Sequence, residues 1–362
     1  MTLTTVDAGM LNSQSQQTWR NRIINGAMVI DQRNAGASVT MSNAVVFTVD
    51  RWWSFEDTDG TMTAQQSSTA PTGFTNSLLC TTTSADASLG ATQRVVISQA
   101  IEGFNIADLG WGTASAQTVT LSFWVRSSLT GIFGGAIKNA SSNRTYPFTY
   151  TISSANTWEQ KTITIAGDTS GTWLATNGVG MNVNFGLGVG STYSATAGAW
   201  AAGDFNSATG ATSVVGTNGA TFYITGVQLE KGSTATSFDY RPYGTELALC
   251  QRYCEAYNAD GGTNYAYFSI GSVQTSTNTR QTFNFKTQKR ALPTATTSAA
   301  NTFILDASPS SFTVSTLALD RTTLNGATLE ANPASSTMSS QQCVRMIQNN
   351  TSTCFIIFSS EL

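Results

Sequence analysis

The chain has 362 residues, enough for one large domain or two to three ordinary ones, and only 11% of them are charged, against about a quarter in an average protein. Its 18 basic and 21 acidic residues give a net charge of −3 with no run of either sign, which argues against binding to nucleic acid or to an anionic membrane. Histidine is absent, which excludes catalysis by a histidine triad or at a histidine-bound metal.

The five cysteines are an odd number without metal-ligand spacing, so we expect mainly free, buried thiols, no bound metal and no cofactor. The N-terminal residues lack the positive and apolar regions of a secretion signal, and no segment approaches the ~18 apolar residues of a membrane span. We therefore expect assembly in a bacterial cytoplasm and no membrane insertion.

Residues 1–18 are polar and unpatterned, which indicates an N-terminal arm that attaches the chain to other proteins. From Trp19 onward, NRIINGAMVIDQRNAG predicts a short strand and a turn, and AVVFTVDRWWSFE predicts a second strand. Trp52 and Trp53 are adjacent in that strand and must point to opposite faces, so at most one of them belongs to the core of a one-faced sheet.

Strict alternation is clearest in TVTLSFWVRSS, where Val119, Leu121, Phe123 and Val125 share one face and Trp124 lies on the other. The same pattern recurs in MNVNFGLGVG, WEQKTITIAG and TFYITGVQLEKG. Short strands separated by Gly, Asn, Ser and Thr turns predict an all-β protein whose residues 19–243 form a jelly-roll β-sandwich.

A change of composition places a domain boundary near residue 244. Leu247, Cys250, Cys254 and Tyr257 follow the spacing of one short helical face. Five further segments predict strands of a smaller C-terminal β-sandwich over residues 244–362, with the last forming a hairpin around Asn349 and Asn350: NYAYFSIG, RQTFNFKT, NTFILDA, SFTVSTLAL and CVRMIQNNTSTCFIIFSSEL.

Several blocks stand in an order that resembles a group of phage and prophage tail proteins. They are NRIINGAMVIDQRN, TVDRWW, QAIEGFNIADLGWG, TVTLSFWVRSSLTG, TGVQLEKGSTATSFDYRPYGTELALCQRYCEAY and the terminal FSSEL. The resemblance covers most of residues 19–257 and continues more weakly beyond them. Such proteins are tail-fibre or receptor-binding components, and their central body is similar to the jelly rolls of carbohydrate-binding modules.

This resemblance implies a noncatalytic virion protein of a tailed bacteriophage, a tail-fibre subunit that adheres to host surface glycans. It also implies a homo-oligomer, by analogy a trimer, that is joined to other virion proteins through residues 1–25. Two alternatives remain at this point: a head decoration or head-fibre protein, and a polysaccharide depolymerase.

Sugar sites offer flat aromatic faces beside amide and carboxylate groups. Trp124 projects from the polar side of its strand, Trp111 and Trp200 lie in Gly/Ala-rich loops, and the C-terminal domain has a cluster of Tyr257, Tyr265, Tyr267 and Phe268 beside Asp260 and Asn264. The glycan- or receptor-binding candidates are therefore Trp111, Trp124, Trp200, Tyr257, Tyr265 and Tyr267. The alternative for each is packing in the core or at a subunit interface.

Two further possibilities concern carboxylates. Similar carbohydrate-binding jelly rolls hold a structural calcium with acidic residues, but the corresponding stretches here, at Asn25 to Val29 and Ile224 to Val227, contain none. Glu56, Asp57 and Asp59 offer another calcium site or, more simply, a solvated turn. Glycoside hydrolysis needs two carboxylates roughly 5 to 10 Å apart, and the glutamates available for it are Glu56, Glu102, Glu159 and Glu230.

Overall fold

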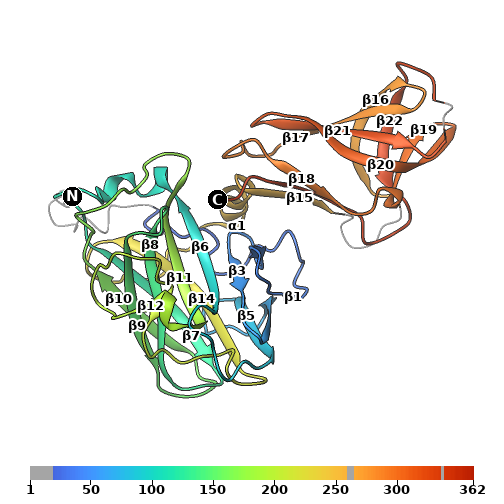
Figure 1. Cartoon of the computed structure of the whole chain (residues 1–362). Helices are drawn as coiled ribbons and strands as arrows, with labels where there is room; N and C mark the ends of the chain where they lie inside the picture. Colours follow the sequence, from blue (N-terminus) through green and yellow to red (C-terminus); the bar gives the residue numbers. More distant parts are fainter. Residues whose placement is uncertain (1–18, 259–264, 336–337) are drawn as a thin grey trace, which may run out of the picture. The chain divides into compact units, whose positions relative to one another are not determined.

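The computed structural model describes residues 19–258, 265–335 and 338–362, and these are almost entirely strands, turns and loops (Figure 1). Contacts divide the described residues into two units. The first comprises residues 19–29, 38–46 and 53–242, and the second comprises residues 30–37, 47–52 and 243–362. The predicted all-β class is confirmed.

Two six-stranded sheets build the first unit. In sheet order, the first sheet is β1 (Val39–Thr40), β4 (Thr61–Ser67), β5 (Ser77–Ser84), β14 (Thr221–Lys231), β7 (Val119–Ser127) and β10 (Glu159–Ile165). The second is β2 (Val46–Phe47), β3 (Trp53–Glu56), β6 (Arg94–Glu102), β11 (Val179–Val189), β8 (Gly131–Asn139) and β9 (Thr145–Ile152). Shorter elements are β12 (Ser194–Ala195), β13 (Ser207–Ala208) and the 3-10 turns η2 (Gly103–Asn105), η3 (Ala107–Leu109) and η4 (Ser191–Tyr193).

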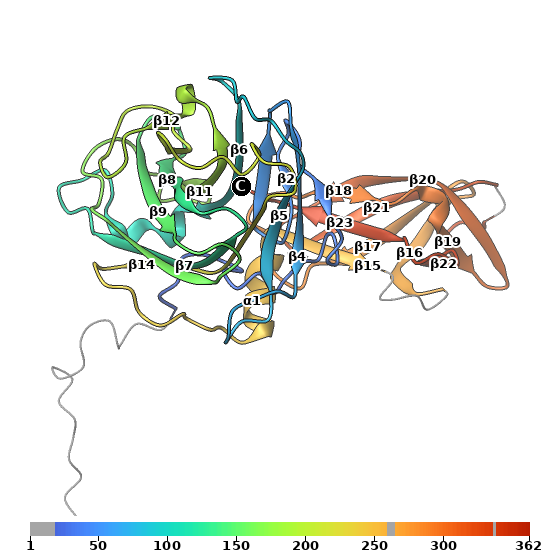
Figure 2. The same ribbon diagram turned by 90° about the horizontal axis from the view of Figure 1, so that it is seen from below.

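The two sheets face each other across an aromatic core. Phe123 of β7 meets Phe185 of β11 with ring centroids 5.0 Å apart, and Phe133 of β8 meets Phe222 of β14 at 6.1 Å. Strands distant in sequence are neighbours: β14 lies between β5 and β7, and its place beside β7 is visible in both views (Figures 1 and 2). The predicted sandwich with jelly-roll connections is therefore confirmed.

The alternation in β7 positions side chains as predicted, with one difference. Leu121, Phe123 and Val125 are fully buried in the core, but Thr120 and Ser122 on the opposite face are buried as well. The segment after β14 covers them, and the Thr120 hydroxyl donates to the Gly232 carbonyl at 2.8 Å. On this outer face of β7, Trp124 and Arg126 remain partly exposed to solvent.

The second unit contains the helix α1 (Tyr243–Gln251), a three-stranded sheet and a closed barrel of six strands. The sheet is β15 (Cys254–Asn258), β23 (Phe355–Ser359) and β18 (Thr294–Thr297). The barrel is β16 (Tyr267–Thr275), β17 (Asn278–Asn284), β21 (Gly326–Pro333), β20 (Ser310–Thr322), β19 (Phe303–Ala307) and β22 (Cys343–Gln348), with the turn η5 (Ala300–Thr302) before β19. Six of the C-terminal strands thus form a closed barrel, where the sequence predicted the two open layers of a second sandwich.

Two local predictions in this unit are wrong. The helix ends at Gln251, so Cys254 and Tyr257 lie on β15 rather than on a helical face. The strands flanking Asn349 and Asn350 do not pair as a hairpin, because β22 belongs to the barrel and β23 to the three-stranded sheet. No helix in the described parts of the chain is long and apolar enough to span a bilayer.

Residues 30–37 and 47–52 group with the second unit, whereas the sequence placed them in the jelly-roll body. Their polar side chains explain the difference. Arg33 pairs with Glu361 at 3.1 Å, Arg51 pairs with the same carboxylate, and the guanidinium of Arg51 lies 3.6 Å from the ring centroid of Tyr253. Gln32 donates to Asp50 and to the Cys254 carbonyl. Early and late parts of the sequence thus share one buried polar network.

Candidate functional site

Trp124 marks the most promising surface of the first unit, the outer face of the sheet that contains β7. Its neighbours in register are Gln160 on β10 and Thr225 on β14. One row further along β7, Arg126 lies opposite Tyr223, and Tyr223 lies opposite Leu79 of β5. All of these side chains point away from the core because they alternate with buried residues.

Six aromatic side chains lie on this surface, and we call the surface that they form the aromatic face. Its members, all half-buried or exposed, are Phe74, Trp124, Trp158, Tyr223, Phe238 and Tyr240. The rings of Trp158 and Tyr223 are 6.1 Å apart, and the Arg126 guanidinium lies 4.9 Å from the Tyr223 ring centroid. Phe74, Phe238 and Tyr240 form a triangle with centroid distances of 4.8 to 5.5 Å.

A β-bulge in β14 joins the two halves of the aromatic face. The register with β7 shifts between Thr225 and Gln228, and Gly226 within the bulge has a φ of +60°. A Cβ atom at Gly226 would lie 2.6 Å from Phe74 Cζ and 3.1 Å from Trp124 Cδ1. Both rings therefore pack directly against a backbone that only glycine leaves open.

The segment 232–241 borders this face and leaves part of it accessible. Gln228 and Glu230 are buried beneath it, and the Glu230 carboxylate accepts hydrogen bonds from the Thr236 amide and hydroxyl, both at 2.8 Å. At the end of the segment the Tyr240 hydroxyl donates to the Gly73 carbonyl at 2.8 Å, while 59% of the residue stays exposed. The border is thus anchored beside Phe74.

The arrangement suits a polar ligand with C–H-rich faces. Aromatic rings stack against such faces, while amide and hydroxyl groups at the edges bond to ligand hydroxyls. Gln160 and Thr162 of β10 are exposed beside Trp124 and supply such groups. The buried hydroxyl of Thr225 makes no hydrogen bond to any described residue. Sequence analysis found Trp124 but missed the five other rings, because β14, β7 and residues 71–76 are far apart in the chain.

Trp111 and Trp200 lie elsewhere, in a cluster with Trp173 and Tyr146. Trp111 is only 6% exposed, and its ring meets those of Trp173 and Trp200 edge-to-face at 4.7 and 5.3 Å. The Nε1 atoms of Trp111 and Trp200 donate to the carbonyls of Gln117 and Ala166. The structure therefore corrects the prediction for Trp111: several loops converge on this indole and form a small core, and a Gly/Ala-rich loop sequence does not reveal such convergence.

The tyrosine candidates of the second unit differ in their surroundings. Tyr257 packs against Phe283 and Phe358, and its hydroxyl is 2.9 Å from the Glu255 carboxylate, so it supports the interior rather than an exposed cluster. Tyr265 and Tyr267 are 55% and 61% exposed. Phe268 is buried in the barrel, and Asp260 and Asn264 lie outside the described residues. Within the second unit, the tyrosine candidates therefore divide into the half-buried Tyr257 and the exposed Tyr265 and Tyr267.

The four candidate glutamates lie on four different strands. Glu56 accepts hydrogen bonds from the Met62 amide and the Thr58 hydroxyl, and burial raises its pKa. Glu159 accepts a hydrogen bond from Lys161 at 2.6 Å; burial opposes its charge, but Lys161 and the backbone amides of Ser153 and Ser154 lower its pKa overall. Glu230 is held by segment 232–241, and Glu102 is 2% exposed.

The turn after β3 is held by hydrogen bonds between backbone amides and the carboxylates of Asp57 and Asp86. Asp57 accepts the Arg94 amide at 2.6 Å, and the Asp59 amide donates to Asp86. A polar depression of about 420 Å³ lies beside them, lined by residues that include Glu56, Asp57 and Thr58. Within the described ranges, no three His, Cys, Asp or Glu side chains converge as metal ligands would.

No protein-family model and no curated protein matches this chain. Among solved structures it is similar to the enzymatically active domain of tailspike protein 4 from bacteriophage CBA120, with 12% identity and a TM-score of 0.32 over 59% of this chain and 21% of that chain. It is also similar to a putative sugar binding protein from Bacteroides thetaiotaomicron, with 12% identity and a TM-score of 0.34 over 59% of this chain and 100% of that chain.

A third similar structure is a family 11 carbohydrate-binding module from Clostridium thermocellum in complex with a β-1,3-1,4-mixed-linked tetrasaccharide. The identity is 12% and the TM-score 0.27 over 54% of this chain and 96% of that chain. At these identities and TM-scores, the likenesses carry no argument about ligand, site or reaction.

Proposed function

We propose that the chain is a noncatalytic glycan-binding subunit of a tailed-bacteriophage tail fibre, and that the aromatic face holds the host surface glycan. The observation that carries the proposal is six aromatic rings on one outer sheet face, around the solvent-accessible indole of Trp124. The order of sequence blocks that resembles phage tail proteins supports the virion assignment. In this proposal the protein is part of the tail fibre after assembly in the host cytoplasm.

The proposed binding is weak at each site and strong in the assembly. A shallow aromatic surface makes few hydrogen bonds, so each contact with a sugar contributes modestly. Several identical subunits, three in the proposed homotrimer, present the same face to a repeating polysaccharide and convert weak contacts into avidity. Residues 1–25 would join the oligomer to other virion proteins.

A binding role fits the state of the glutamates better than depolymerisation does. Hydrogen bonds from backbone amides and neighbouring side chains are accepted by the carboxylates of Glu56, Glu159 and Glu230. A general acid needs a raised pKa beside the scissile bond, yet Glu159 has a lowered one. Glu56, whose pKa is raised, lies on β3 of the other sheet.

Replacing Trp124 by alanine tests the proposal. The full chain is applied to an array of purified bacterial surface polysaccharides, and the Kd for any polysaccharide that binds is measured for both proteins. Loss of a central indole costs ~1.5 to 3 kcal/mol, so we expect Trp124→Ala to raise the Kd about tenfold to a hundredfold. Phe104, which is 61% exposed on η2, provides the matched control Phe104→Ala, with unchanged Kd.

Equal affinity of the Trp124 variant and the parent chain would reject the aromatic face as the site. Reducing ends released from a bound polysaccharide, and no longer released after a Glu→Gln change, would reject the noncatalytic role. Purification of the chain with capsid proteins rather than tail proteins would move it to the phage head.

A further inference from the structure

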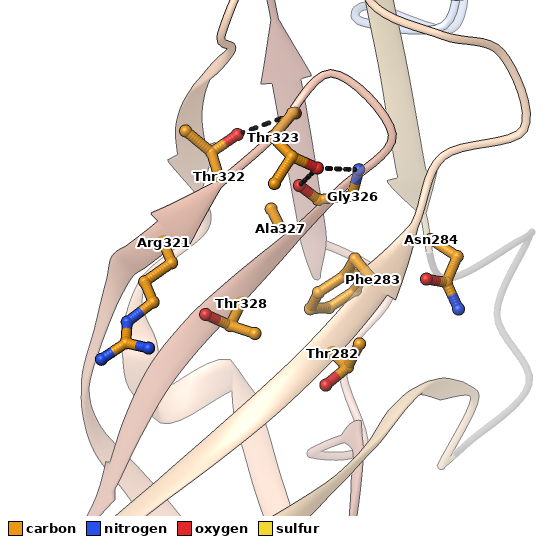
Figure 3. Close-up of a pocket in the computed structure, with 9 residues that line it drawn as sticks. All are labelled: Thr282, Phe283, Asn284, Arg321, Thr322, Thr323, Gly326, Ala327 and Thr328. Atoms are coloured by element: carbon orange, nitrogen blue, oxygen red, sulfur yellow. Dashed lines mark hydrogen bonds between the residues drawn. The ribbon is translucent and has the colours of Figure 1, made fainter.

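A second depression lies in the barrel of the C-terminal unit and does not involve the residues of the aromatic face. It measures about 210 Å³, roughly the share of seven waters, and is lined by residues of β17, β20, β21 and the β20–β21 turn (Figure 3). Phe283, Gly326 and Ala327 form the part of the lining without polar side chains. The polar part consists of four threonines, one asparagine and one arginine: Thr282, Thr322, Thr323, Thr328, Asn284 and Arg321. This volume fits one sugar residue rather than a chain.

Strand register arranges the polar groups in two rows. Thr328 of β21 lies opposite Thr282 of β17 and opposite Arg321 of β20, so these side chains form a row across three strands, about 10 Å from end to end. Figure 3 shows the row with Arg321 at one end and Thr282 at the other. In the next row Asn284 lies opposite Gly326, which has no side chain and leaves the surface low.

The β20–β21 turn makes one rim of the depression rigid. The Thr323 hydroxyl accepts the Gly326 amide at 3.1 Å and the Asn325 amide at 3.2 Å, and the Thr323 amide donates to the Gly326 carbonyl at 2.8 Å. These bonds fix the turn without using the side chains of Thr282, Asn284 or Arg321. The rim is therefore formed in advance of any ligand.

Three lining side chains retain capacity for a ligand. No hydrogen bond joins the Thr282 hydroxyl or the Asn284 side-chain amide to another described residue, and Arg321 is 75% exposed at its side chain. Arg321 meets Asp320 only at 3.8 Å, because that carboxylate is already bound by Arg280 at 3.0 Å and by the Thr328 hydroxyl at 3.1 Å. Glu330 lies one row away, opposite Arg280. Arg321 thus shares Asp320 with Arg280 as an ion-pair partner, and its guanidinium makes no closer ion pair than 3.8 Å in the described residues.

We propose that this depression binds one carboxylate-bearing sugar residue, such as a uronic acid, of an acidic surface polysaccharide. The planar guanidinium of Arg321 takes the carboxylate through two parallel hydrogen bonds, a geometry that arginine favours. Thr282 and the Asn284 amide bond to ring hydroxyls, since both offer a donor and an acceptor. The site gives the barrel a preference for acidic over neutral glycans.

Titrations of the isotope-labelled full chain, followed by backbone amide NMR, test the proposal with sodium galacturonate, galactose and inorganic phosphate as probes. Galacturonate should shift the amides of residues 282–284 and 321–328 saturably, with a Kd of about 1 to 10 mM. Galactose and phosphate should bind at least about tenfold more weakly, because one lacks the carboxylate and the other lacks the ring hydroxyls.

Variants separate this site from the rest of the protein. Arg321→Gln should raise the Kd for galacturonate at least about tenfold, while its spectrum elsewhere stays that of the folded chain. Arg345→Gln, on β22 of the same barrel and 58% exposed at its side chain, is the matched control and should leave the Kd unchanged, as should Phe104→Ala in the first unit. Equal binding of galactose or phosphate, no saturable shift, or an unaffected Arg321 variant would overturn the proposal without touching that for the aromatic face.

Discussion

Lys289 and Glu255 form a fully buried ion pair that offers a sharp test of how the C-terminal unit is held together. Both side chains are 0% exposed, and Lys289 Nζ lies 2.7 Å from Glu255 Oε2. The same carboxylate accepts the Tyr257 hydroxyl at 2.9 Å and the Lys286 amide at 3.2 Å. Replacing Lys289 by methionine keeps the stem of the side chain but leaves a buried carboxylate without its cation.

The expected loss is large because desolvation of the remaining charge is no longer offset. Breaking a buried pair on one side costs about 3 to 5 kcal/mol, and the two surviving hydrogen bonds place Lys289→Met near 3 kcal/mol. The double variant Glu255→Gln/Lys289→Met removes the orphaned charge and should recover about 1 to 3 kcal/mol of that loss.

Urea unfolding of the full chain, together with hydrogen exchange of the β15 and β23 amides, measures these changes in the unit concerned. Lys286→Met is the matched control, because Lys286 is exposed and its removal should change stability by less than about 0.5 kcal/mol. A loss below about 1 kcal/mol for Lys289→Met, or a double variant no more stable than the single one, would refute this reasoning.

Two further outcomes are expected. Gly226→Ala should lower stability by about 1 to 3 kcal/mol and weaken glycan binding, because φ is +60° there and the new methyl group meets Phe74; thermal unfolding and the polysaccharide Kd check this. Burial raises the pKa of Asp50 from its usual range to about 6, so the fold favours the protonated form, and stability should fall by up to about 3 kcal/mol as the pH rises from 4 to 6. Asp50→Asn should remove this slope in urea unfolding, and an unchanged slope would contradict the assignment.

The ion pairs of Arg33 and Arg51 with Glu361 in the second unit could not be predicted from the sequence. The sequence shows DQR and DRWW as separate polar interruptions of apolar segments, and nothing local predicts that Arg33 and Arg51 meet Glu361. Contacts between residues about 310 to 330 positions apart leave no periodic signature. For that reason the sequence placed residues 30–37 and 47–52 in the jelly-roll body, whereas their contacts group them with the second unit.

The aromatic face divides in the same way. Alternation alone placed Trp124 outward from a core of Leu121, Phe123 and Val125, since side chains on a strand repeat every two residues. The other rings lie beside Trp124 because β14 pairs with β7 and because β14 has a bulge at Gly226. Pairing between strands so far apart in the sequence leaves no local signal in it. Trp111 failed as a candidate for the same reason, because loops from distant parts of the chain bury it.

The sequence by itself determined the all-β class, the facing of the best-patterned strands, and the absence of any histidine-based chemistry, since composition and two-residue periodicity are properties of the chain. Only the tertiary structure decided that the C-terminal strands close into a barrel, that the last two strands part into different sheets, and that Arg321 lies with two threonines in one row. Strand pairing is chosen by the global packing of apolar faces, and many pairings satisfy the same local pattern.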